Sequence, residues 1–451
     1  MTAVDRRPAV RAHIAALRPR RVELGLIALI AVVVVSAYGL ASLGESASVP
    51  ADIGPFLAWM LGLFFAAHLA VRRFAPAADP VLLPMALLLN GIGYVMIARL
   101  GEDVEDGGDL AGLQSVWTAV GIGAFVATLV FVRRVRMLAQ YRYLLGVGGI
   151  GLLALPLLPI GIELNGARIW VSIGPVNFQP GEFAKIALAL FFASYLVDTA
   201  ELIKNRIELR DLAPIGAAWA ASIGVMVLEK DLGSSMLVFA LFVVLMWVAT
   251  ERTLFLGLGA GMFVAGGVVA FRLFAHVERR IDSWLDPWAD PQDSGYQILQ
   301  ATYSMAEGGL TGTGLGRGEP DRVPFAETDF IFAAIGEELG LAGTTAILMA
   351  FLILIGSGLR IALRATRPFE KLLAVGLTTL LGIQAFIIMG GVVRLIPLTG
   401  ITLPFVSYGG SALVSNYIVL ALLIRLSHEQ RTTSSPTPVS STPVSPRAGA
   451  R

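Results

Sequence analysis

Long apolar runs separated by short polar connections make up most of the chain. A helix that crosses a bilayer needs about 20 mostly apolar residues, and about twelve runs approach that length. They cover residues 24–43, 53–71, 81–100, 116–132, 143–162, 183–197, 213–228, 232–249, 254–274, 330–359, 372–393 and 403–426. The pattern therefore predicts an all-α polytopic membrane protein.

One polar stretch, residues 276–329, is much longer than a connection between two spans requires. It contains SWLDPWADPQDSGYQ at 283–297 and GGLTGTGLGRGEP at 308–320, and it leads into ETDFIF at 327–332. The glycines lack the strand and helix context of a nucleotide-binding loop, so they predict tight turns and close approach to a ligand or to the membrane surface. The carboxylates and aromatics of this stretch indicate a site at the membrane surface.

Basic residues alternate between the predicted connections. One series of loops contains Arg72 and Arg73, then Arg133, Arg134, Arg136 and Arg142, then Lys204, Arg206 and Arg210, then Arg360, Arg364, Arg367 and Lys371. The intervening loop 101–114 has five acids and no base. Because Lys and Arg favour cytoplasmic loops, both termini are expected in the cytoplasm and 276–329 outside.

The two ends of the chain carry no predicted span. Residues 1–23 form a basic N-terminus with six arginines, and the apolar run that follows is too long for a cleavable signal peptide. The tail, residues 428–451, is rich in Ser, Thr and Pro from Thr432 onward, and its composition predicts disorder. We therefore expect a retained anchor at one end and a disordered cytoplasmic tail at the other.

Composition excludes several kinds of chemistry. The chain is 56% hydrophobic with a mean hydropathy of +0.74, and only 15% of it is charged, against roughly 25% in a soluble domain. A net charge of +1 gives no reason to expect a nucleic-acid partner, and the absence of cysteine excludes disulfides, zinc-thiolate sites and thiol catalysis. The four histidines are scattered, so no histidine metal cluster is predicted.

Two pairs of polar residues each have a structural and a functional interpretation. Asp286 and Asp290 both precede proline, which is typical of a helix start, but either could instead act as a general base. Glu182 and Lys185 are three apart at the start of an apolar helix and share a face. They form either an internal ion pair or part of a functional site, because charges in a membrane are rare.

Several further motifs resemble the SEDS family, the RodA, FtsW and SpoVE proteins. The resembling segments are NGARIWVSIGPVNFQPGEFAK at 165–185, KDLGSS at 230–235, WLDPWADPQDSGYQILQ at 284–300, ETDFIFAAIGEELG at 327–340 and PLTGITLPFVSYGGSA at 397–412. The wider form at 394–418 resembles the RodA-type elongation proteins of actinobacteria. The chain has Gly181 where the family usually has serine, and Met389-Gly390-Gly391 where an asparagine is frequent.

The resemblance implies how the chain is organised and what it does. A ten-helix core with the extracytoplasmic loop would occupy residues 79–427, preceded by two additional helices in 24–78. Such proteins are peptidoglycan glycosyltransferases, which polymerise lipid II, the undecaprenyl-diphosphate disaccharide-pentapeptide, onto a nascent glycan strand with inversion. The implied partners are therefore lipid II, that strand, membrane lipids and a class B penicillin-binding protein.

The resemblance also implies which residues form the site. The family's essential aspartate corresponds to Asp290, and one base suffices because diphosphate is already a good leaving group. The cationic candidates for holding the diphosphate are Arg168, Lys185, Arg279, Arg280 and Arg394. The full substrate-binding set is Arg168, Trp170, Glu182, Lys185, Arg279, Asp329, Glu338, Arg394, Ser407 and Tyr408. Trp170 could instead be an interfacial belt residue. No dedicated metal site is visible, although a divalent Mg or Mn ion bound with the diphosphate is compatible with the sequence.

Three other functions are compatible with a chain of this kind. A lipid II flippase or solute carrier would place its site near the membrane midplane on broken helices. A scaffold would position a penicillin-binding partner without catalysing anything, and a division-type polymerase would differ only in its cellular role. Purified protein incubated with lipid II separates the first two from a polymerase, because only a polymerase makes glycan without another enzyme.

Overall fold

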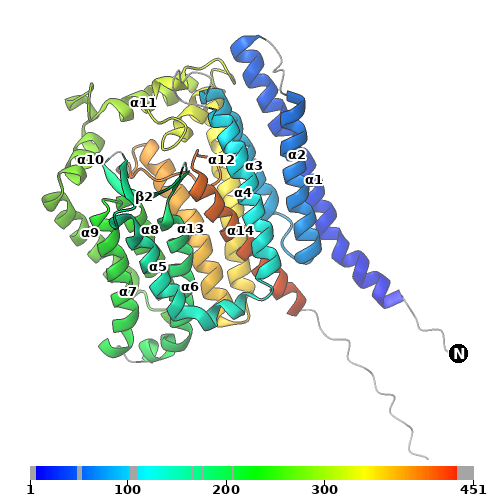
Figure 1. The fold of residues 1–451 in the computed structure, drawn as a ribbon, viewed down its shortest axis with the longest axis vertical. Coiled ribbons are helices and arrows are strands. Elements are labelled where there is room, and N and C mark those ends of the chain that lie inside the picture. Colours follow the sequence, from blue (N-terminus) through cyan, green and yellow to red (C-terminus); the bar gives the residue numbers. More distant parts are fainter. Residues whose placement is uncertain are drawn as a thin grey trace, which may run out of the picture.

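The computed structural model describes residues 7–47, 53–101, 109–164, 166–174, 176–205 and 208–433. Within them, 12 helices are long and apolar enough to cross a membrane, which confirms the predicted polytopic helical class. They stand side by side as one bundle (Figure 1). The acids of the predicted outer loop at 102–108 and the tail from 434 lie outside the described residues.

The spanning helices follow one another with short connections. They are α1 (Arg7–Ser46), α2 (Ile53–Phe74), α3 (Leu82–Gly101), α4 (Leu110–Phe131), α5 (Arg142–Ala154), α6 (Pro180–Asn205), α7 (Leu209–Leu228), α8 (Leu232–Thr250), α9 (Leu254–Leu273), α12 (Ile331–Arg364), α13 (Pro368–Val392) and α14 (Gly410–Thr433). The first described residues of α1 and the last of α14 lie at the same end of the bundle, called here the lower end (Figure 1).

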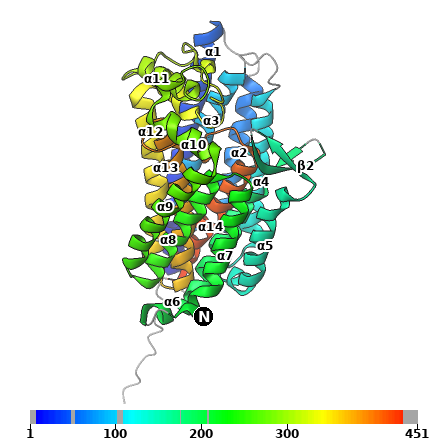
Figure 2. The same cartoon turned by 90° about the vertical axis from the view of Figure 1, so that its left-hand side faces the viewer.

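The upper end carries the elements that do not span. They are α10 (Ala275–Leu285), α11 (Tyr296–Gly308), the 3-10 turns η3 (Pro287–Ala289) and η4 (Pro320–Arg322), and a sheet of β1 (Gly161–Leu164), β2 (Ala167–Ile173) and β3 (Val176–Phe178). The turns η1 (Val135–Tyr141) and η2 (Leu155–Leu157) flank α5. The strands pair antiparallel in the order β1-β2-β3 and project from the side of the bundle (Figure 2).

Two of the expected spans are shorter in the structure. The run 143–162 ends as helix at Ala154, and Gly161 already belongs to β1. The run 403–426 becomes helical only at Gly410. The first difference follows from Pro156 after the end of α5, because proline lacks an amide hydrogen and cannot continue a helix from within it. The second follows from the left-handed backbone at Phe405, whose φ of +64° cannot belong to a right-handed helix. The sheet is an addition that apolar periodicity did not predict.

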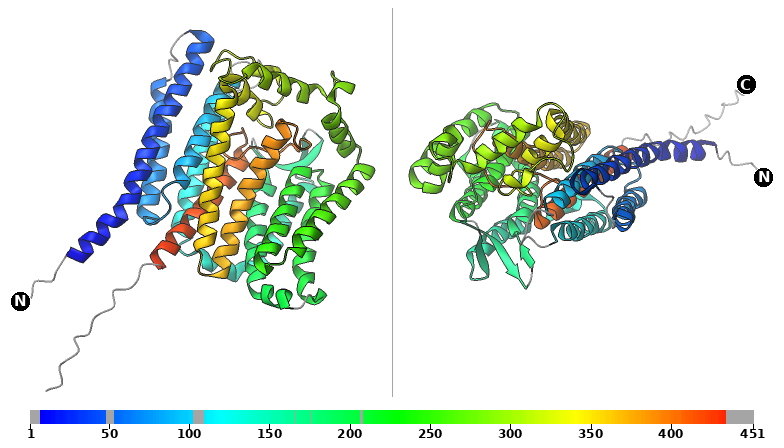
Figure 3. Two further views of the ribbon diagram at one scale, coloured as in Figure 1. Left: turned by 180° about the vertical axis from the view of Figure 1, so that it is seen from behind. Right: turned by 90° about the horizontal axis from the view of Figure 1, so that it is seen from above.

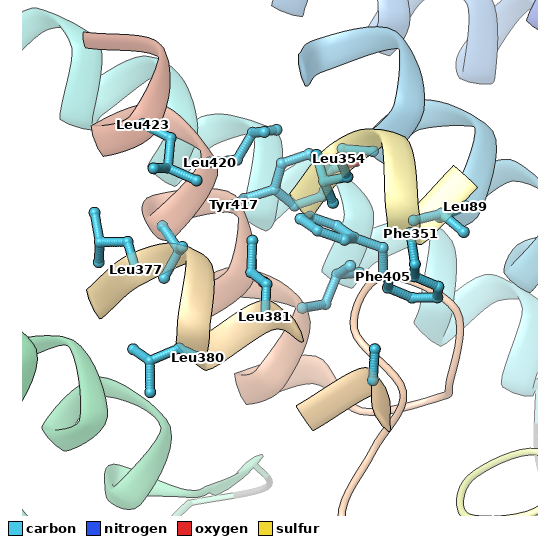
Figure 4. Packing of buried hydrophobic residues seen from close by; sticks show 14 of the residues in the cluster. Leu89, Phe351, Leu354, Leu377, Leu380, Leu381, Phe405, Tyr417, Leu420 and Leu423 are labelled. Carbon is cyan, nitrogen blue, oxygen red and sulfur yellow. The ribbon is translucent and has the colours of Figure 1, made fainter. Parts of the chain in front are cut away.

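The core of the bundle lies where α3, α4, α12, α13 and α14 meet, around the fully buried Tyr417 (Figure 4). Its ring packs edge-on against Phe405 at 5.4 Å between centroids, and its hydroxyl donates to Asn90 Oδ1 at 3.2 Å. Asn90 Nδ2 in turn donates to the Phe405 carbonyl at 3.4 Å. The loop before α14 is thereby held against α3 by buried polar contacts that the low dielectric strengthens.

The glycine-rich segment at 308–318 packs on α12 rather than facing open space. Helix α12 is interrupted at Gly340, where φ is +63°. The amides of Thr313 and Gly314 donate to the carbonyls of Glu337 and Glu338 at 2.9 and 3.1 Å, while Leu341 N donates to the Gly309 carbonyl at 2.9 Å. The segment therefore satisfies backbone groups that the interruption leaves open, as an apolar environment demands.

Close approach of two backbones explains why glycine is needed at this contact. A Cβ on Gly312 would lie 2.1 Å from the Glu338 carbonyl oxygen, and one on Gly340 would lie 2.3 Å from the Gly312 nitrogen. Both residues also have positive φ. The expected close approach is therefore present at Gly312, where the element approached is α12, and at Gly316, where it is α1.

The N-terminal helix pair forms one edge of the bundle (Figure 3) and is attached through buried charges at both ends. Near the lower end, Glu23 on α1 pairs with Arg20, and it lies 2.7 Å from His68 on α2. At the upper end, Arg99 on α3 lies 3.2 Å from Glu45 on α1 and 3.4 Å from Glu338 on α12. The lower pairs join α1 to α2, and Arg20 also donates to the Ala78 carbonyl in the link before α3. The upper pairs connect α1 to the core, in a medium where unpaired charge is costly.

Replacing Arg99 should destabilise the protein because Glu338, with no exposed surface, would lose its cationic partner. Arg99→Leu should cost roughly 3–5 kcal/mol of unfolding free energy, as expected for breaking a buried ion pair from one side. Removing both charges, in Arg99→Leu/Glu338→Leu, should recover most of that loss. The measurement is the thermal unfolding midpoint of the purified variants. A single variant as stable as the wild type would show that the pair does not anchor the helices.

Candidate active site at the upper end of the bundle

A buried ion pair lies at the start of α6. Lys185 Nζ is 2.8 Å from Glu182 Oε1, and only 4% of each residue is exposed. The lysine also donates to Gln384 Oε1 on α13 at 3.3 Å, and Ser415 on α14 donates to Glu182 Oε2 at 2.9 Å. The predicted shared face of Glu182 and Lys185 is confirmed, and their partners join three helices at one polar point.

The turn between α7 and α8 adds two more carboxyls. Asp231 caps α8 by accepting from Ser234 N at 2.9 Å, and burial raises the pKa of its carboxyl. The charges of Lys185 and Glu182 also act on Asp231, in opposite directions. Burial raises the pKa of Glu229 to about 8, and the Asp231 carboxylate adds to that shift. The turn therefore brings acidic groups that resist ionisation close to the ion pair.

Arg280 on α10 and Asp329 before α12 lie on either side of Gly400. Arg280 Nη1 donates to the Thr399 carbonyl at 2.9 Å. A Cβ on Gly400 would be 3.5 Å from both Arg280 Nη2 and Asp329 Oδ2. Burial lowers the pKa of Arg280, against the opposing effect of the Asp329 and Asp231 carboxylates. Arg280 is therefore a partly desolvated cation facing acids on two other elements.

The Asp329 carboxyl is ionised only with difficulty. Burial raises its pKa to about 7, the Arg280 guanidinium opposes the shift, and the Glu327 carboxylate adds to it. Near neutral pH, Asp329 can therefore exist in either protonation state.

Asp286 and Asp290 occupy an exposed turn directly after α10. Asp286 Oδ1 accepts from Trp288 N at 3.1 Å and so caps η3. Asp290 Oδ2 accepts from the Ser294 amide at 3.3 Å and from its hydroxyl at 3.2 Å. The predicted helix-start role is therefore confirmed for Asp286, whereas Asp290 ends η3 and holds the following turn instead of capping a helix. The general-base interpretation of Asp290 stays a prediction, and both contacts with Ser294 use a single carboxylate oxygen, Oδ2.

Three hydrogen bonds clip α10 to the chain between α13 and α14. Besides the bond from Arg280 to Thr399, Trp284 Nε1 donates to the Arg394 carbonyl at 3.0 Å. Arg394 Nη2 returns a bond to the Trp284 carbonyl at 2.9 Å, and its own φ is +59°. Because Arg280 and Trp284 are four apart, both lie on one face of α10. The clip places the turn with Asp290 beside the upper end of α13.

The loop before α14 is also attached to the segment before α12. Ser407 Oγ donates to the Thr328 carbonyl at 2.6 Å, and Tyr408 N donates to the Glu327 carbonyl at 2.8 Å. Burial, with the Glu327 charge, raises the pKa of the Tyr408 phenol. Ser407 is therefore a structural contact here, whereas Tyr408 faces an acid at the site.

Most of the predicted site residues lie either on the helices and loops of the upper end or on β2. Glu182, Lys185, Asp329 and Tyr408 belong to connected parts of the upper end, and Arg394 contributes through the clip. Arg168 lies on β2, where its amide donates to the Glu229 carbonyl at 3.1 Å and its guanidinium to the Leu158 carbonyl at 3.0 Å. Trp170, half-buried on the same strand, pairs with Ile162 in register.

Two predicted substrate contacts have other surroundings. Arg279 is exposed, and its neighbour Arg280 makes the inward contacts. Glu338 pairs with Arg99 beside α1. Sequence reasoning did not single out Asp231 or Gln384 for the site. The signal for Asp231 was its position inside KDLGSS, whereas nothing local distinguishes Gln384, which becomes visible only through its bonds to Lys185 and to the Thr402 carbonyl at 2.8 Å.

No group of three acidic or histidine side chains able to hold a metal converges within the part of the chain that the structure describes. The Asp290 and Asp286 oxygens accept from amide donors, as shown above. A divalent cation at this end would therefore need oxygen ligands from a bound diphosphate in addition to a loop carboxylate.

Asp329 should make stability depend on pH. A carboxyl whose pKa is raised from about 4 in the unfolded chain to about 7 in the folded one stabilises the fold fully below pH 4, and that contribution is lost as the pH rises through 7. The loss should be at most about 4 kcal/mol. Asp329→Asn should flatten this part of the stability profile, measured as unfolding midpoints between pH 4.5 and 7.5, which are chosen as approximate limits of the window.

The matched control for this experiment is Asp321→Asn, which removes an exposed carboxylate from the same connection. It should leave the wild-type profile unchanged. Equal profiles for the wild type and Asp329→Asn would show that Asp329 ionises as an ordinary surface acid.

Most of the chain matches one protein family. Residues 80–432 match the FtsW/RodA/SpoVE family, described as "Cell cycle protein". The chain is 48% identical over 427 residues to "Peptidoglycan glycosyltransferase RodA" of Mycobacterium tuberculosis (strain ATCC 25618 / H37Rv), covering 91% of each chain. It is 45% identical to the protein of the same name from Mycobacterium leprae, also over 91% of each.

More distant relatives match a shorter part of the chain. "Probable peptidoglycan glycosyltransferase FtsW" of Geobacter metallireducens is 34% identical, over 79% of this chain and 96% of that one. A match over 91% of this chain is too long to be confined to residues 80–432. The mycobacterial relatives therefore share at least part of the N-terminal helix pair.

Solved structures resemble the fold closely. A chain from the structure titled "Structural coordination of polymerization and crosslinking by a peptidoglycan synthase complex" is 28% identical with a TM-score of 0.66, covering 78% of this chain and 98% of that one. Thermus thermophilus Rod shape determining protein RodA is 27% identical with a TM-score of 0.58, covering 79% and 98%. An aspartate-to-alanine mutant of that protein matches equally well, with a TM-score of 0.59.

Proposed function

The chain belongs to the FtsW/RodA/SpoVE family of cell cycle proteins, and on that premise we propose that it polymerises lipid II at the membrane face next to the upper end of the bundle. It is a multi-pass membrane protein and a peptidoglycan glycosyltransferase of the RodA type. The observation that carries the proposal is 48% identity over 91% of the chain to a RodA glycosyltransferase. Its identity to the FtsW relative is 34%, which favours the elongation type.

The proposed reaction joins two sugars and inverts one anomeric centre. Asp290 takes the proton of the acceptor 4-hydroxyl, whose oxygen attacks the anomeric carbon of the donor. The bond from that carbon to the diphosphate oxygen breaks, and the lipid diphosphate leaves with the electron pair. An exposed carboxylate on an anchored turn suits this role, because a general base must come within hydrogen-bond reach of the proton it accepts.

Cations at the upper end would stabilise the leaving diphosphate. Arg280 is the best placed, since it is partly desolvated and shares its position beside Gly400 with Asp329. Lys185 would contribute if a bound diphosphate competes with Glu182 for its ammonium. Arg168, Trp170 and Arg394 would act by positioning, because the guanidinium groups of both arginines already donate to backbone carbonyls.

A penicillin-binding protein of class B is the proposed partner. One solved structure similar to this chain carries a title about coordinated polymerization and crosslinking by a peptidoglycan synthase complex. This chain supplies the glycan-forming activity, so a partner would have to supply the peptide cross-links. The upper end is then proposed to lie outside the cytoplasmic membrane, with both termini inside.

Asp290→Asn should abolish polymerisation while leaving the fold intact. The asparagine side-chain oxygen can accept from Ser294 as the carboxylate does, so the turn and the unfolding midpoint should be preserved. It cannot accept the proton, so glycan synthesis by purified protein from lipid II should fall roughly 100- to 10,000-fold. Asp286→Asn is the control and should keep most of its activity. Substantial synthesis by Asp290→Asn would return that residue to a purely structural role.

The same assay distinguishes the alternative functions. Glycan made by the wild-type protein without another enzyme supports a polymerase. Lipid II translocation across vesicles without glycan formation would favour a flippase instead, and neither activity would favour a scaffold.

Sidedness can be tested with single cysteines, because the chain has none of its own. Asp321 in η4 and Thr366 between α12 and α13 are both exposed, at opposite ends of α12. In intact cells, Asp321→Cys should react with an impermeant maleimide and Thr366→Cys should react only after permeabilisation. The reverse pattern would overturn the proposed extracytoplasmic site.

A further inference from the structure

The lower end of the bundle contains a basic cavity far from the proposed active site. It has a volume of about 330 Å³ and lies between α12, α14 and the link that precedes α3. Arg360 and Arg364 line it from α12, Ser427 and Arg431 from α14, and Asp79 from the link. The ends of α12 and α14 run side by side here (Figure 3).

The cavity has an excess of positive charge. Arg431 Nη2 lies 3.0 Å from Asp79 Oδ2, and Asp79 Oδ1 accepts from Val81 N at 3.0 Å. The charge of the Asp79 carboxylate is therefore balanced by Arg431. Arg360 and Arg364 are exposed, and no carboxylate in the described ranges pairs with either. Three arginines and one aspartate leave a net charge of +2 facing the cavity. Such a cavity suits a ligand bearing a phosphate.

An exposed apolar stripe leads from this cavity into the membrane-spanning part of α12. Met349, Ile353 and Gly356 precede Arg360 at spacings of three or four residues, so all lie on one face of the helix. Met349 is 49% and Ile353 43% exposed. At 1.5 Å per residue, Met349 lies about 16 Å from Arg360 along the axis, which is the scale of an acyl chain. Nothing lies within 4 Å of a Cβ on Gly356, so the helix face between Ile353 and Arg360 is open.

We propose that this cavity is a binding site for an anionic phospholipid of the membrane leaflet at the lower end. The phosphate lies between Arg360, Arg364 and the α14 side of the cavity, and one acyl chain follows Ile353 and Met349. The pairing of basic groups at the surface with an apolar stripe beneath them matches the two chemical parts of such a lipid. A bound lipid joins the lower ends of α12 and α14, and it does not depend on the catalytic assignment.

The test compares two double variants that remove equal charge from the same end of the bundle. Arg360→Gln/Arg364→Gln empties the cavity of its two unpaired cations. Arg72→Gln/Arg73→Gln removes two exposed arginines at the end of α2 that do not line the cavity. Each full-length protein is purified in a neutral detergent and titrated by native mass spectrometry with phosphatidylglycerol and with zwitterionic phosphatidylcholine.

The wild type should bind phosphatidylglycerol roughly tenfold more tightly than phosphatidylcholine. Arg360→Gln/Arg364→Gln should lose about tenfold in phosphatidylglycerol affinity and most of the preference, whereas the Arg72→Gln/Arg73→Gln control should stay within about twofold of the wild type. Equal losses of phosphatidylglycerol affinity in both double variants would mean that the lipid is attracted to the basic surface in general. That result would overturn the proposed site. No loss in the cavity variant would overturn it as well.

A third variant tests the acyl-chain part without altering any charge. Gly356→Phe covers the open helix face between Ile353 and Arg360, so it should weaken phosphatidylglycerol binding while leaving the unfolding midpoint unchanged. Competition with inorganic phosphate separates the two possible sources of a phosphate group. Phosphatidylglycerol should remain bound in millimolar phosphate, and displacement would reassign the cavity to a free anion. If the Gly356→Phe variant binds phosphatidylglycerol as tightly as the wild type does, the proposed path of the acyl chain is wrong.

Discussion

The clip that holds α10 against the chain between α13 and α14 is the contact on which the upper end depends. Helix α10 is short and does not cross the membrane, and its buried residues are only Val277 and Ser283, so hydrogen bonds add much of what fixes its position. Arg280 and Trp284 donate to backbone carbonyls on that chain, and Arg394 returns a bond to α10. Because the turn with Asp290 begins where α10 ends, the clip also decides where the proposed base lies.

Arg280 and the chain that accepts its hydrogen bond also connect the clip to the rest of the site. The guanidinium of Arg280 faces Asp329 across Gly400, so the residue that anchors α10 also bears the charge available for a diphosphate. The loop whose Thr399 carbonyl accepts from Arg280 continues to Ser407 and Tyr408. These two residues donate to the segment that carries Asp329. The hydrogen bonds that fix α10 therefore also hold the Arg280 guanidinium in place beside Asp329.

Helix α12 connects the two ends of the molecule. Its upper part is broken at Gly340, where the glycine-rich segment replaces the missing backbone partners and Glu338 pairs with Arg99. Its lower part carries Arg360 and Arg364 into the basic cavity beside α14. The N-terminal helix pair reaches the same upper region in two ways: Glu45 pairs with Arg99 on α3, and Gly44 lies close to the Leu315 carbonyl in the polar connection.

The amino-acid sequence by itself determined the membrane-spanning class, the length of the polar connection at 276–329 and the shared face of Glu182 and Lys185, because these follow from local composition and helical periodicity. Family motifs added the expected role of Asp290. Tertiary structure alone decided that Arg280 and not Arg279 faces inward, that Glu338 belongs to Arg99, and that the glycines pack on α12. Those outcomes depend on which surfaces of distant segments meet, and neither periodicity nor charge spacing contains that information.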